Sequence, residues 1–298
     1  MELIGNKDIL FIINLNAGKS STKRIISELN SQSPEIPYVL TKDLYELEEV
    51  FTSNMEKVKA FIVVGGDGTV RAALKYLYNE EDKLLGVLPT GSGNGFSREL
   101  GFKSSIKTLI DDTKKGQYLD IDILKLNNNL CVNIAGLGID SHIAHLFQKS
   151  KTRGLRNYII STIRSIITFK PIQATVIFDQ QKIEGKFLMI TIANTRQFGN
   201  NAIISPMSKP NDGLFELVLV KPIPMLLYPV FLTRMFLGKL NQCRYISYIQ
   251  IKGSVKIISR FNRYHADGDP MTFSESLSIE MLTEKIRVIQ TNAFRSRS

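Results

Sequence analysis

A carboxylate set in a turn of glycines is the feature of this chain best suited to chemistry. The turn is Gly65-Gly66-Asp67-Gly68-Thr69, which follows an apolar run at 61–64 and precedes a helical pattern at 70–78. A strand, a glycine turn and a helix start bring backbone N–H groups against phosphate in α/β proteins. A bare carboxylate repels a polyphosphate unless it holds a metal ion or accepts a proton. The segment therefore predicts a phosphoryl-transfer site.

A second glycine turn follows the next expected strand, at 84–88, and precedes a helix around residues 96–100. It comprises Thr90, Gly91, Ser92, Gly93 and Asn94. Glycine lets the backbone approach a ligand closely, and the side chains between the glycines supply hydroxyl and amide donors. Two such turns on neighbouring parallel strands share the carboxyl edge of the sheet, where α/β sheets bind ligands. Together they favour a ligand site over two structural loops.

The segment at 17–20, Ala-Gly-Lys-Ser, ends like a Walker A loop. Ile13 stands where that motif needs a glycine, so we reject a lysine-centred P-loop. Asn14 then ends the first strand and Gly18 opens the next helix. Two interpretations stay open: a backbone contact with a nucleotide, or a plain strand-to-helix turn.

The secondary structure that must position these turns is expected to change in type near residue 120. Apolar runs at 9–13, 37–40, 61–64 and 84–88 alternate with helical patterns at 20–29, 43–51, 70–78 and 104–111. This alternation predicts an α/β domain with a doubly wound parallel sheet. After residue 120 short strands dominate, which predicts an antiparallel β-sandwich or barrel, with helices at 140–148 and 153–169. We expect a nucleotide-binding domain at 1–120 and a second domain at 121–298, whose C-terminal residues can return to the first.

Composition and charge limit the class of protein. The 298 residues carry a formal charge of +10 and a pI near 9.5, which suggests an anionic partner or simply a soluble surface. The basic residues are dispersed and form no recognisable nucleic-acid module, so we expect no nucleic-acid partner. Cys131 and Cys243 lie far apart without metal-ligand spacing, which fits a reducing, cytoplasmic compartment. No apolar stretch reaches 18 residues, and the N-terminal run is too short for a signal peptide.

Three motifs together resemble the diacylglycerol kinase catalytic-domain family, which includes bacterial lipid kinases and sphingosine kinases. They are GGDGTV at 65–70, LPTGSGNGF at 88–96 and NIAGLGID at 133–140. The resemblance runs the length of the chain. It matches Asn14 and Gly18 to the family's first nucleotide loop and Thr41 to a threonine near the nucleotide. It also matches two later turns, Asp212-Gly213-Leu214 and Asp267-Gly268-Asp269.

The resemblance implies a fold and an activity. The first domain would be similar to NAD kinase and phosphofructokinase, with a β-sandwich second domain and the active site in the cleft between them. The enzyme would use ATP and Mg²⁺ to phosphorylate a lipid hydroxyl such as that of diacylglycerol. The implied ATP-phosphate contacts are Gly65, Gly66, Asp67, Gly68, Thr69, Thr90, Gly91, Ser92, Gly93 and Asn94.

The same resemblance implies roles for the carboxylates. Asp67 would organise magnesium at the phosphates, and Asp212 with Leu214 would hold a structural magnesium ion. Asp267 or Asp269 would take the proton from the lipid hydroxyl. The residues Asp120 and Asp122 are both candidates for an acidic network near that base, and His265 is a candidate lining of the acceptor site.

Two positions depart from the family pattern. Arg71-Ala72 stand where the family often has Asn-Glu, so an adenine or ribose contact is in doubt. Asp269 replaces a glutamate and is one methylene shorter. Asp and Glu differ by only about 0.4 pKa units when unperturbed, so we expect activity to survive.

Three alternatives remain for the function. They are a sphingoid-base kinase of the same family, a soluble small-molecule kinase of the NAD-kinase type, and a non-catalytic nucleic-acid-binding or regulatory protein suggested by the charge. The second glycine turn and the late Asp-Gly-Asp favour a lipid kinase. We expect peripheral attachment to an anionic membrane, with candidate surfaces at 153–169 and 222–237, each of which also fits a core-packing helix. The resemblance suggests a homodimer. His142 and His145 are expected to line a surface or cleft, and the loop at 194–199 to be exposed.

Overall fold

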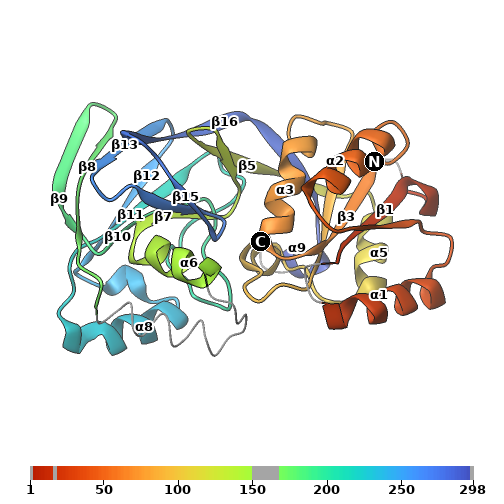
Figure 1. The fold of residues 1–298 in the computed structure, drawn as a ribbon, viewed down its shortest axis with the longest axis horizontal. Helices are drawn as coiled ribbons and strands as arrows, with labels where there is room; N and C mark the ends of the chain where they lie inside the picture. Colours follow the sequence, from red (N-terminus) through yellow and green to blue (C-terminus); the bar gives the residue numbers. More distant parts are fainter. Residues whose placement is uncertain (1–2, 16–18, 150–167, 296–298) are drawn as a thin grey trace. The chain divides into compact units, whose positions relative to one another are not determined.

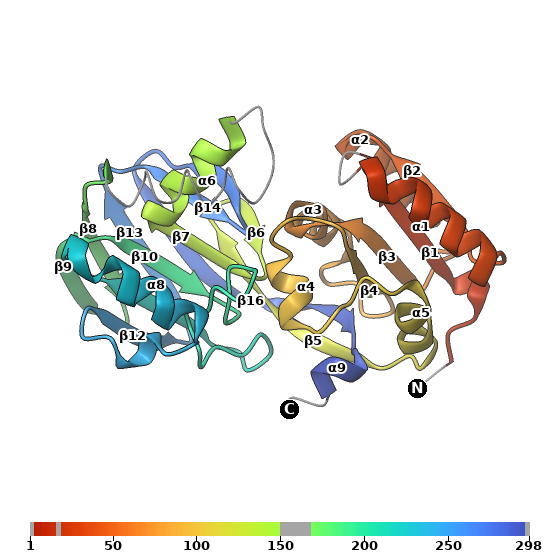
Figure 2. The ribbon, with the colours of Figure 1, turned by 90° about the horizontal axis from the view of Figure 1, so that it is seen from below.

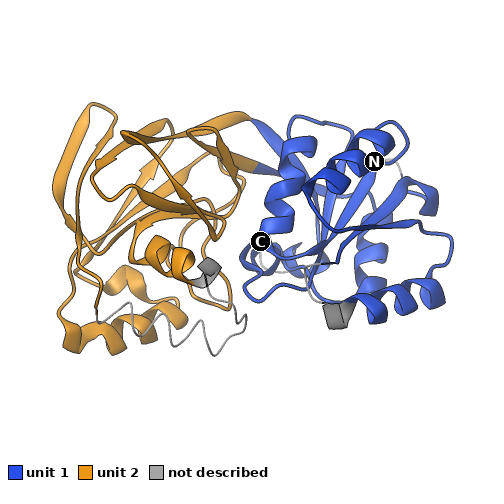
Figure 3. Ribbon diagram, viewed as in Figure 1, with its two compact units in different colours: residues 1–121, 284–298 blue, residues 122–283 orange. Residues whose placement is uncertain are grey.

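The structure, a computed structural model, describes residues 3–15, 19–149 and 168–295. The chain divides into two compact units (Figure 3). Unit 1 comprises Met1–Ile121 together with Glu284–Ser298, and unit 2 comprises Asp122–Thr283. The C-terminal residues are therefore part of the same compact unit as the N-terminal residues.

Unit 1 is built on a parallel sheet (Figure 1). Its strands are β1 (Ile9–Asn14), β2 (Tyr38–Thr41), β3 (Ala60–Gly65) and β4 (Leu84–Pro89), in the order β2-β1-β3-β4. Strands β1 and β3 are apolar and buried along almost their whole length, as expected of parallel strands covered on both faces. The final strand, β16 (Ser276–Ile289), joins this sheet where Val288 pairs in parallel with Leu85 of β4.

Helices cover both faces of this sheet, which confirms the doubly wound α/β fold. Helix α1 (Lys19–Gln32) packs with α5 (Ile106–Lys114), and α2 (Leu44–Asn54) packs with α3 (Asp67–Leu77). The short α4 (Gly95–Glu99) follows β4. Side-chain caps set two of the starts, because Asp43 accepts from the amides of Tyr45 and Glu46, and Ser105 accepts from that of Thr108.

Unit 2 is a sandwich of two antiparallel sheets. One has the order β12-β11-β10-β7-β14-β15, formed by Ile246–Ile251, Phe215–Val220, Met189–Ala193, Ile134–Gly138, Arg263–Ala266 and Asp269–Thr272. The other contains β16, β13 (Ser254–Ser259), β8 (Ile172–Phe178) and β9 (Gln181–Phe187), with β5 (Tyr118–Leu126) and β6 (Asn129–Cys131) beside them. Leu137 and Leu217 from the first sheet and Val176 and Leu277 from the second share one buried core.

The outer face of the six-stranded sheet is covered by α6 (Ile139–Lys149), η2 (Met225–Leu227) and α8 (Tyr228–Phe236) (Figure 2). Ile139 and Ile143 of α6 and Phe231 of α8 pack with Val218 and Val220 of the sheet. Among the described residues no helix is long and apolar enough to cross a membrane. The expected helix at 153–169 falls almost wholly outside the described residues.

Several expected strands differ from those observed. The apolar run at 130–135 predicts one strand, but it is divided between β6 and β7. The runs at 277–281 and 286–289 predict two strands, but they form the single strand β16. Strands β9, β14 and β15 were not expected from the sequence. Strand β9 is polar and mostly exposed, so it lacks the apolar run by which the other strands were found.

Candidate active-site residues

The carboxyl edge of the parallel sheet gathers the glycine turns of unit 1. Strands β1, β2, β3 and β4 run in the same direction, so their ends at Asn14, Thr41, Gly65 and Pro89 lie along one edge. Asn14 stands opposite Thr41 in the register, and Gly65 stands opposite Pro89. The two turns that follow β3 and β4 therefore begin side by side. Gly18 falls outside the described residues.

The backbones of the two turns are in contact. A Cβ built on Gly91 would lie 2.7 Å from the Cα of Gly66, and one built on Gly66 would lie 3.2 Å from the Cα of Gly91. At Gly65 a Cβ would collide with the side chain of Thr69 at 2.2 Å. Glycine is required at these positions because any side chain would separate the turns or displace the start of α3.

Asp67 ties the two turns together. Its Oδ2 accepts the amide of Gly95 at 3.0 Å, and its Oδ1 accepts the amide of Phe96 at 3.1 Å. Those two amides open helix α4, so a negative charge caps a helix N-terminus. The carboxylate therefore holds the second turn against the first, a role that the sequence pattern does not reveal.

The residues of this edge fit a polyphosphate with magnesium. Gly66 caps α3 without a side-chain acceptor, so the start of this 11-residue helix presents its first amides to an anion. The buried Oδ1 of Asn94 has no hydrogen-bond partner, while its Nδ2 donates to the Gly91 carbonyl at 2.6 Å. A ligand hydroxyl or hydrated cation would satisfy that oxygen. Each oxygen of Asp67 accepts one amide, and a carboxylate of this kind is a ligand type that Mg²⁺ uses.

The remaining candidates of unit 1 support the same edge. The Nδ2 of Asn14 lies 3.4 Å from the Oγ1 of Thr69, the last residue of the first turn. Thr41 is buried at the end of β2, where its carbonyl accepts the amide of Leu15. Asp120 makes a surface ion pair with Arg287 at 3.3 Å. Arg71 follows the turn within α3.

In unit 2, Asp267 lies in a nest of hydrogen-bond donors. Its carboxylate accepts the backbone amides of Val132, Asn133 and Ile134 at 3.2, 2.8 and 3.2 Å. The Cys131 thiol also donates to it at 3.0 Å, and burial together with the Asp267 charge raises the pKa of that thiol well above its usual value. The carboxylate is buried and committed to the junction between β6 and β7.

We expect Asp267→Asn to lower the free energy of unfolding by about 3 kcal/mol, because an amide nitrogen facing backbone donors leaves buried groups unpaired. The matched control is Asp179→Asn, since Asp179 is exposed and shares the left-handed backbone, with φ 43° against 50° at Asp267. The control should change stability by less than about 0.5 kcal/mol. Urea unfolding of both variants measures the difference, and equal stabilities would contradict the structural role of Asp267.

Asp269 follows this nest and is half-exposed at the start of β15. The turn before it is fixed by His265, a buried residue of β14 whose Nδ1 lies 3.4 Å from the amide of Gly268. The Nε2 of the same ring lies 3.3 Å from Oδ2 of Asp140. Because Gly268 donates to Nδ1, the proton of the neutral ring is on Nε2 and is donated to Asp140. His265 thus supports the Asp-Gly-Asp turn.

Asp212 and Leu214 lie in a separate exposed turn. The Oδ1 of Asp212 accepts the amide of Leu214 at 3.1 Å, and the buried Asp122 accepts the amide of Gly213 at 2.7 Å. The carboxylate of Asp122 therefore helps to hold the turn at 212–214. In the part of the chain that the structure describes, no three His, Cys, Asp or Glu side chains are grouped to hold a metal ion. One carboxylate with backbone carbonyls and waters still fits magnesium.

The loop at 194–199 is not exposed as expected. Asn194 and Thr195 are fully buried, because Asn194 donates to the carbonyls of Asp122 and Val132, and Thr195 bonds the side chain of Asn133. The Phe198 ring lies 6.0 Å from that of His265. The polar side chains of this loop therefore hold the backbone near Asp122 and Asn133, which in turn supports the turns at 212–214 and 267–269.

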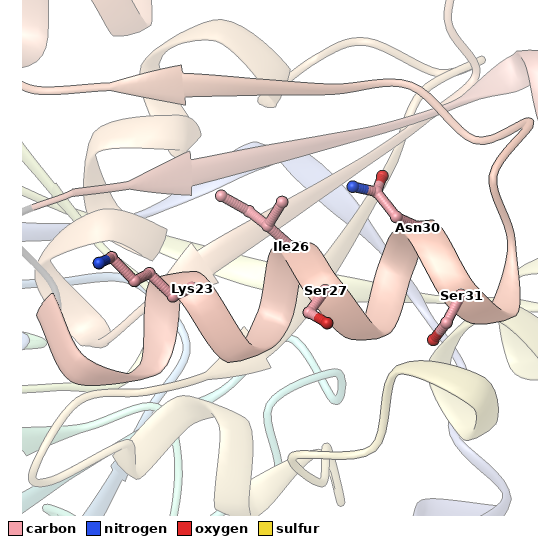
Figure 4. Close-up of a pocket in the computed structure, with 5 residues that line it drawn as sticks. All are labelled: Lys23, Ile26, Ser27, Asn30 and Ser31. Carbon is pink, nitrogen blue, oxygen red and sulfur yellow. The ribbon is translucent and has the colours of Figure 1, made fainter.

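A surface hollow beside α1 is distinct from these residues. It is lined by Lys23, Ile26, Ser27, Asn30 and Ser31, which all come from that one helix (Figure 4). None of them belongs to the glycine turns, and they include no carboxylate. The hollow therefore offers nothing for phosphoryl transfer.

Solved structures share this fold. A diacylglycerol kinase from Bacillus anthracis superposes with a TM-score of 0.72 at 21% identity, covering 97% of this chain and 98% of that one. An NAD kinase from Archaeoglobus fulgidus in complex with ATP superposes with a TM-score of 0.56 at 15% identity, covering 97% and 96%. The two-domain fold is therefore that of the NAD kinase and diacylglycerol kinase class, as expected.

Two family patterns cover most of the sequence. Residues 8–126 match the diacylglycerol kinase catalytic domain, and residues 133–290 match the YegS C-terminal NAD kinase beta sandwich-like domain. The chain belongs to the diacylglycerol kinase catalytic-domain family, which confirms the resemblance seen in its motifs.

Curated relatives include a "Probable lipid kinase YegS-like" of Shewanella frigidimarina, 27% identical over 62% of this chain. A diacylglycerol kinase of Bacillus subtilis is 29% identical over 54% of it. This chain spans 61% and 54% of the length of these two relatives.

Proposed function

We propose that this protein is a lipid kinase that uses Mg²⁺ and ATP to phosphorylate the hydroxyl of a lipid such as diacylglycerol. The observation that carries the proposal is the pair of glycine turns held in contact by Asp67 at one edge of the parallel sheet. Family membership and lipid-kinase relatives support the substrate class. The buried Oδ1 of Asn94 supports a ligand at that edge.

Phosphoryl transfer depends mostly on positioning the phosphate and the acceptor hydroxyl and on neutralising the negative charge of the phosphate oxygens. In the proposal, the amides at the start of α3 and the turn Thr90–Asn94 hold the phosphates, and Asn14, Gly18 and Thr41 contact the rest of the nucleotide. Asp67 would hold magnesium, which would neutralise the charge on the phosphate oxygens. A second, structural magnesium ion is assigned to Asp212 and the Leu214 backbone.

We assign the general base to Asp269. Asp267 accepts four donors in a buried nest, so it is poorly placed to take a proton from a substrate. Asp269 is half-exposed on a turn that His265 supports. In the reaction, the lipid hydroxyl gives its proton to Asp269 and its oxygen bonds the γ-phosphorus. The bond between that phosphorus and the bridging oxygen breaks, and ADP leaves.

The test compares acceptors with γ-labelled ATP and magnesium. Purified protein should transfer label to a lipid extract containing diacylglycerol and should not transfer it to NAD. Purified diacylglycerol and sphingosine, assayed separately, distinguish the two lipid classes. Label in NAD alone would replace the proposal with a soluble NAD-kinase activity. We further propose that the protein works in the cytoplasm, attached peripherally to a membrane, as a homodimer.

A further inference from the structure

The segment that runs from η2 through α8 to Leu237 exposes some of its apolar side chains and buries others. Its inner side is held by the buried Phe231, with Leu227, Leu232 and Met235 packed beside it against the six-stranded sheet. On the other side Leu226 is 91% exposed, Val230 48% and Leu237 63%. An amphipathic helix of a globular protein normally carries polar residues on its outer side.

Exposed apolar residues lie along the whole segment from η2 to the residue after α8. Leu226 lies in η2, while Val230 and Leu237, seven residues apart, fall on the same side of an α-helix with 3.6 residues per turn. Met225 and Phe236, also exposed, adjoin them. We call these five residues, Met225, Leu226, Val230, Phe236 and Leu237, the outer α8 face. Contiguous exposed apolar residues of this kind mark binding surfaces.

The charged residues that flank the outer α8 face in the sequence all have one sign. Lys221 and Lys239 flank it in the sequence, Arg234 lies within α8, and Arg244 follows soon after. No Asp or Glu occurs between Glu216 and Asp267. Within the described residues, none of these four basic side chains makes a salt bridge. An exposed apolar segment flanked in the sequence by basic residues is suited to an anionic partner.

We propose that the outer α8 face docks on an anionic lipid bilayer, with its apolar side chains among the acyl chains and the basic residues at the headgroups. The inference rests on the proposed function, because a lipid acceptor resides in a bilayer. A second copy of the chain fits less well. A two-fold contact sets the same patch against itself, and here it would oppose like charges.

Flotation with vesicles tests the docking without requiring catalysis. The full chain should bind vesicles of phosphatidylcholine mixed with phosphatidylglycerol more tightly than vesicles of phosphatidylcholine alone, and salt should weaken that preference. The double variant Leu226→Gln/Leu237→Gln should lower the partition coefficient by at least about tenfold. Lys221→Gln/Lys239→Gln should lower it about fivefold for each charge, on anionic vesicles only.

The matched control is Leu44→Gln, because Leu44 is a similarly exposed leucine of unit 1. It should bind vesicles as the unsubstituted chain does. Unchanged flotation of both double variants overturns the proposal. So does a leucine double variant that turns a dimer into a monomer in light scattering while vesicle binding persists, since a second copy would then cover the face.

A kinase assay separates this inference from the proposed function. The leucine double variant should retain its rate on a dispersed short-chain diacylglycerol and lose at least about tenfold on the same headgroup embedded in anionic vesicles. Equal losses on both acceptors would overturn docking. Wild-type flotation without any lipid phosphorylation would instead refute the proposed function and leave the docking surface standing.

Discussion

Asp269→Asn should lower kcat for lipid phosphorylation by at least about 100-fold while the protein stays folded. The amide has nearly the shape of the carboxylate but cannot accept the hydroxyl proton, so the loss measures general-base assistance. Because Asp269 is half-exposed at the start of β15 and lies outside the buried nest of Asp267, thermal unfolding should change little. Initial rates at saturating Mg-ATP, together with a melting curve, provide the measurement.

The matched control for this prediction is Glu275→Gln, an exposed carboxylate six residues further along the chain. Its rate should equal that of the unsubstituted protein. Full activity of Asp269→Asn would place the base elsewhere.

Asp67→Ala should abolish ATP-dependent lipid phosphorylation, with a loss of at least about 100-fold. Two effects combine. The substitution removes the charge that we assign to magnesium, and it frees the amides of Gly95 and Phe96 that hold the second turn against the first. The residual rate, measured over a magnesium titration, should require a higher magnesium concentration than that of the unsubstituted protein.

Asp111→Asn serves as the control for Asp67, because Asp111 is an exposed carboxylate on α5 of the same unit. It should leave the rate and its magnesium dependence unchanged. If Asp67→Ala loses activity with an unaltered magnesium dependence, its role is confined to joining the two turns. Undiminished turnover would remove Asp67 from the site altogether.

The sequence predicts unit 1 well because its signals are local. Apolar strands such as β3 and β4 stand between helical patterns and end in glycine turns. Because the strands are parallel, the turns that follow them lie at one edge of the sheet, and no other sequence signal is needed to predict this placement. The tie from Asp67 to α4 depends on side-chain direction across 28 residues, which spacing cannot supply.

Unit 2 is harder to predict because one of its turns lacks the usual residues and many of its side-chain contacts join residues that are distant in the sequence. The hairpin from β8 to β9 turns at Asp179 and Gln180, both with positive φ, and neither is the glycine that usually marks such a turn. Polarity in the loop at 194–199 suggests exposure, yet Asn194 and Thr195 are buried with their partners. Likewise, the sequence does not distinguish Asp267 from Asp269, whereas the structure does, because the amides at the junction between β6 and β7 surround Asp267 alone.

The central claim is that a lipid hydroxyl accepts the γ-phosphate of ATP. Mass spectrometry of lipids after incubation with purified protein and Mg-ATP tests it most directly. We expect a phosphorylated lipid, with diacylglycerol converted to its phosphate, and at least about 100-fold less product from Asp269→Asn. ATP turnover with no phosphorylated lipid of any class would contradict the account.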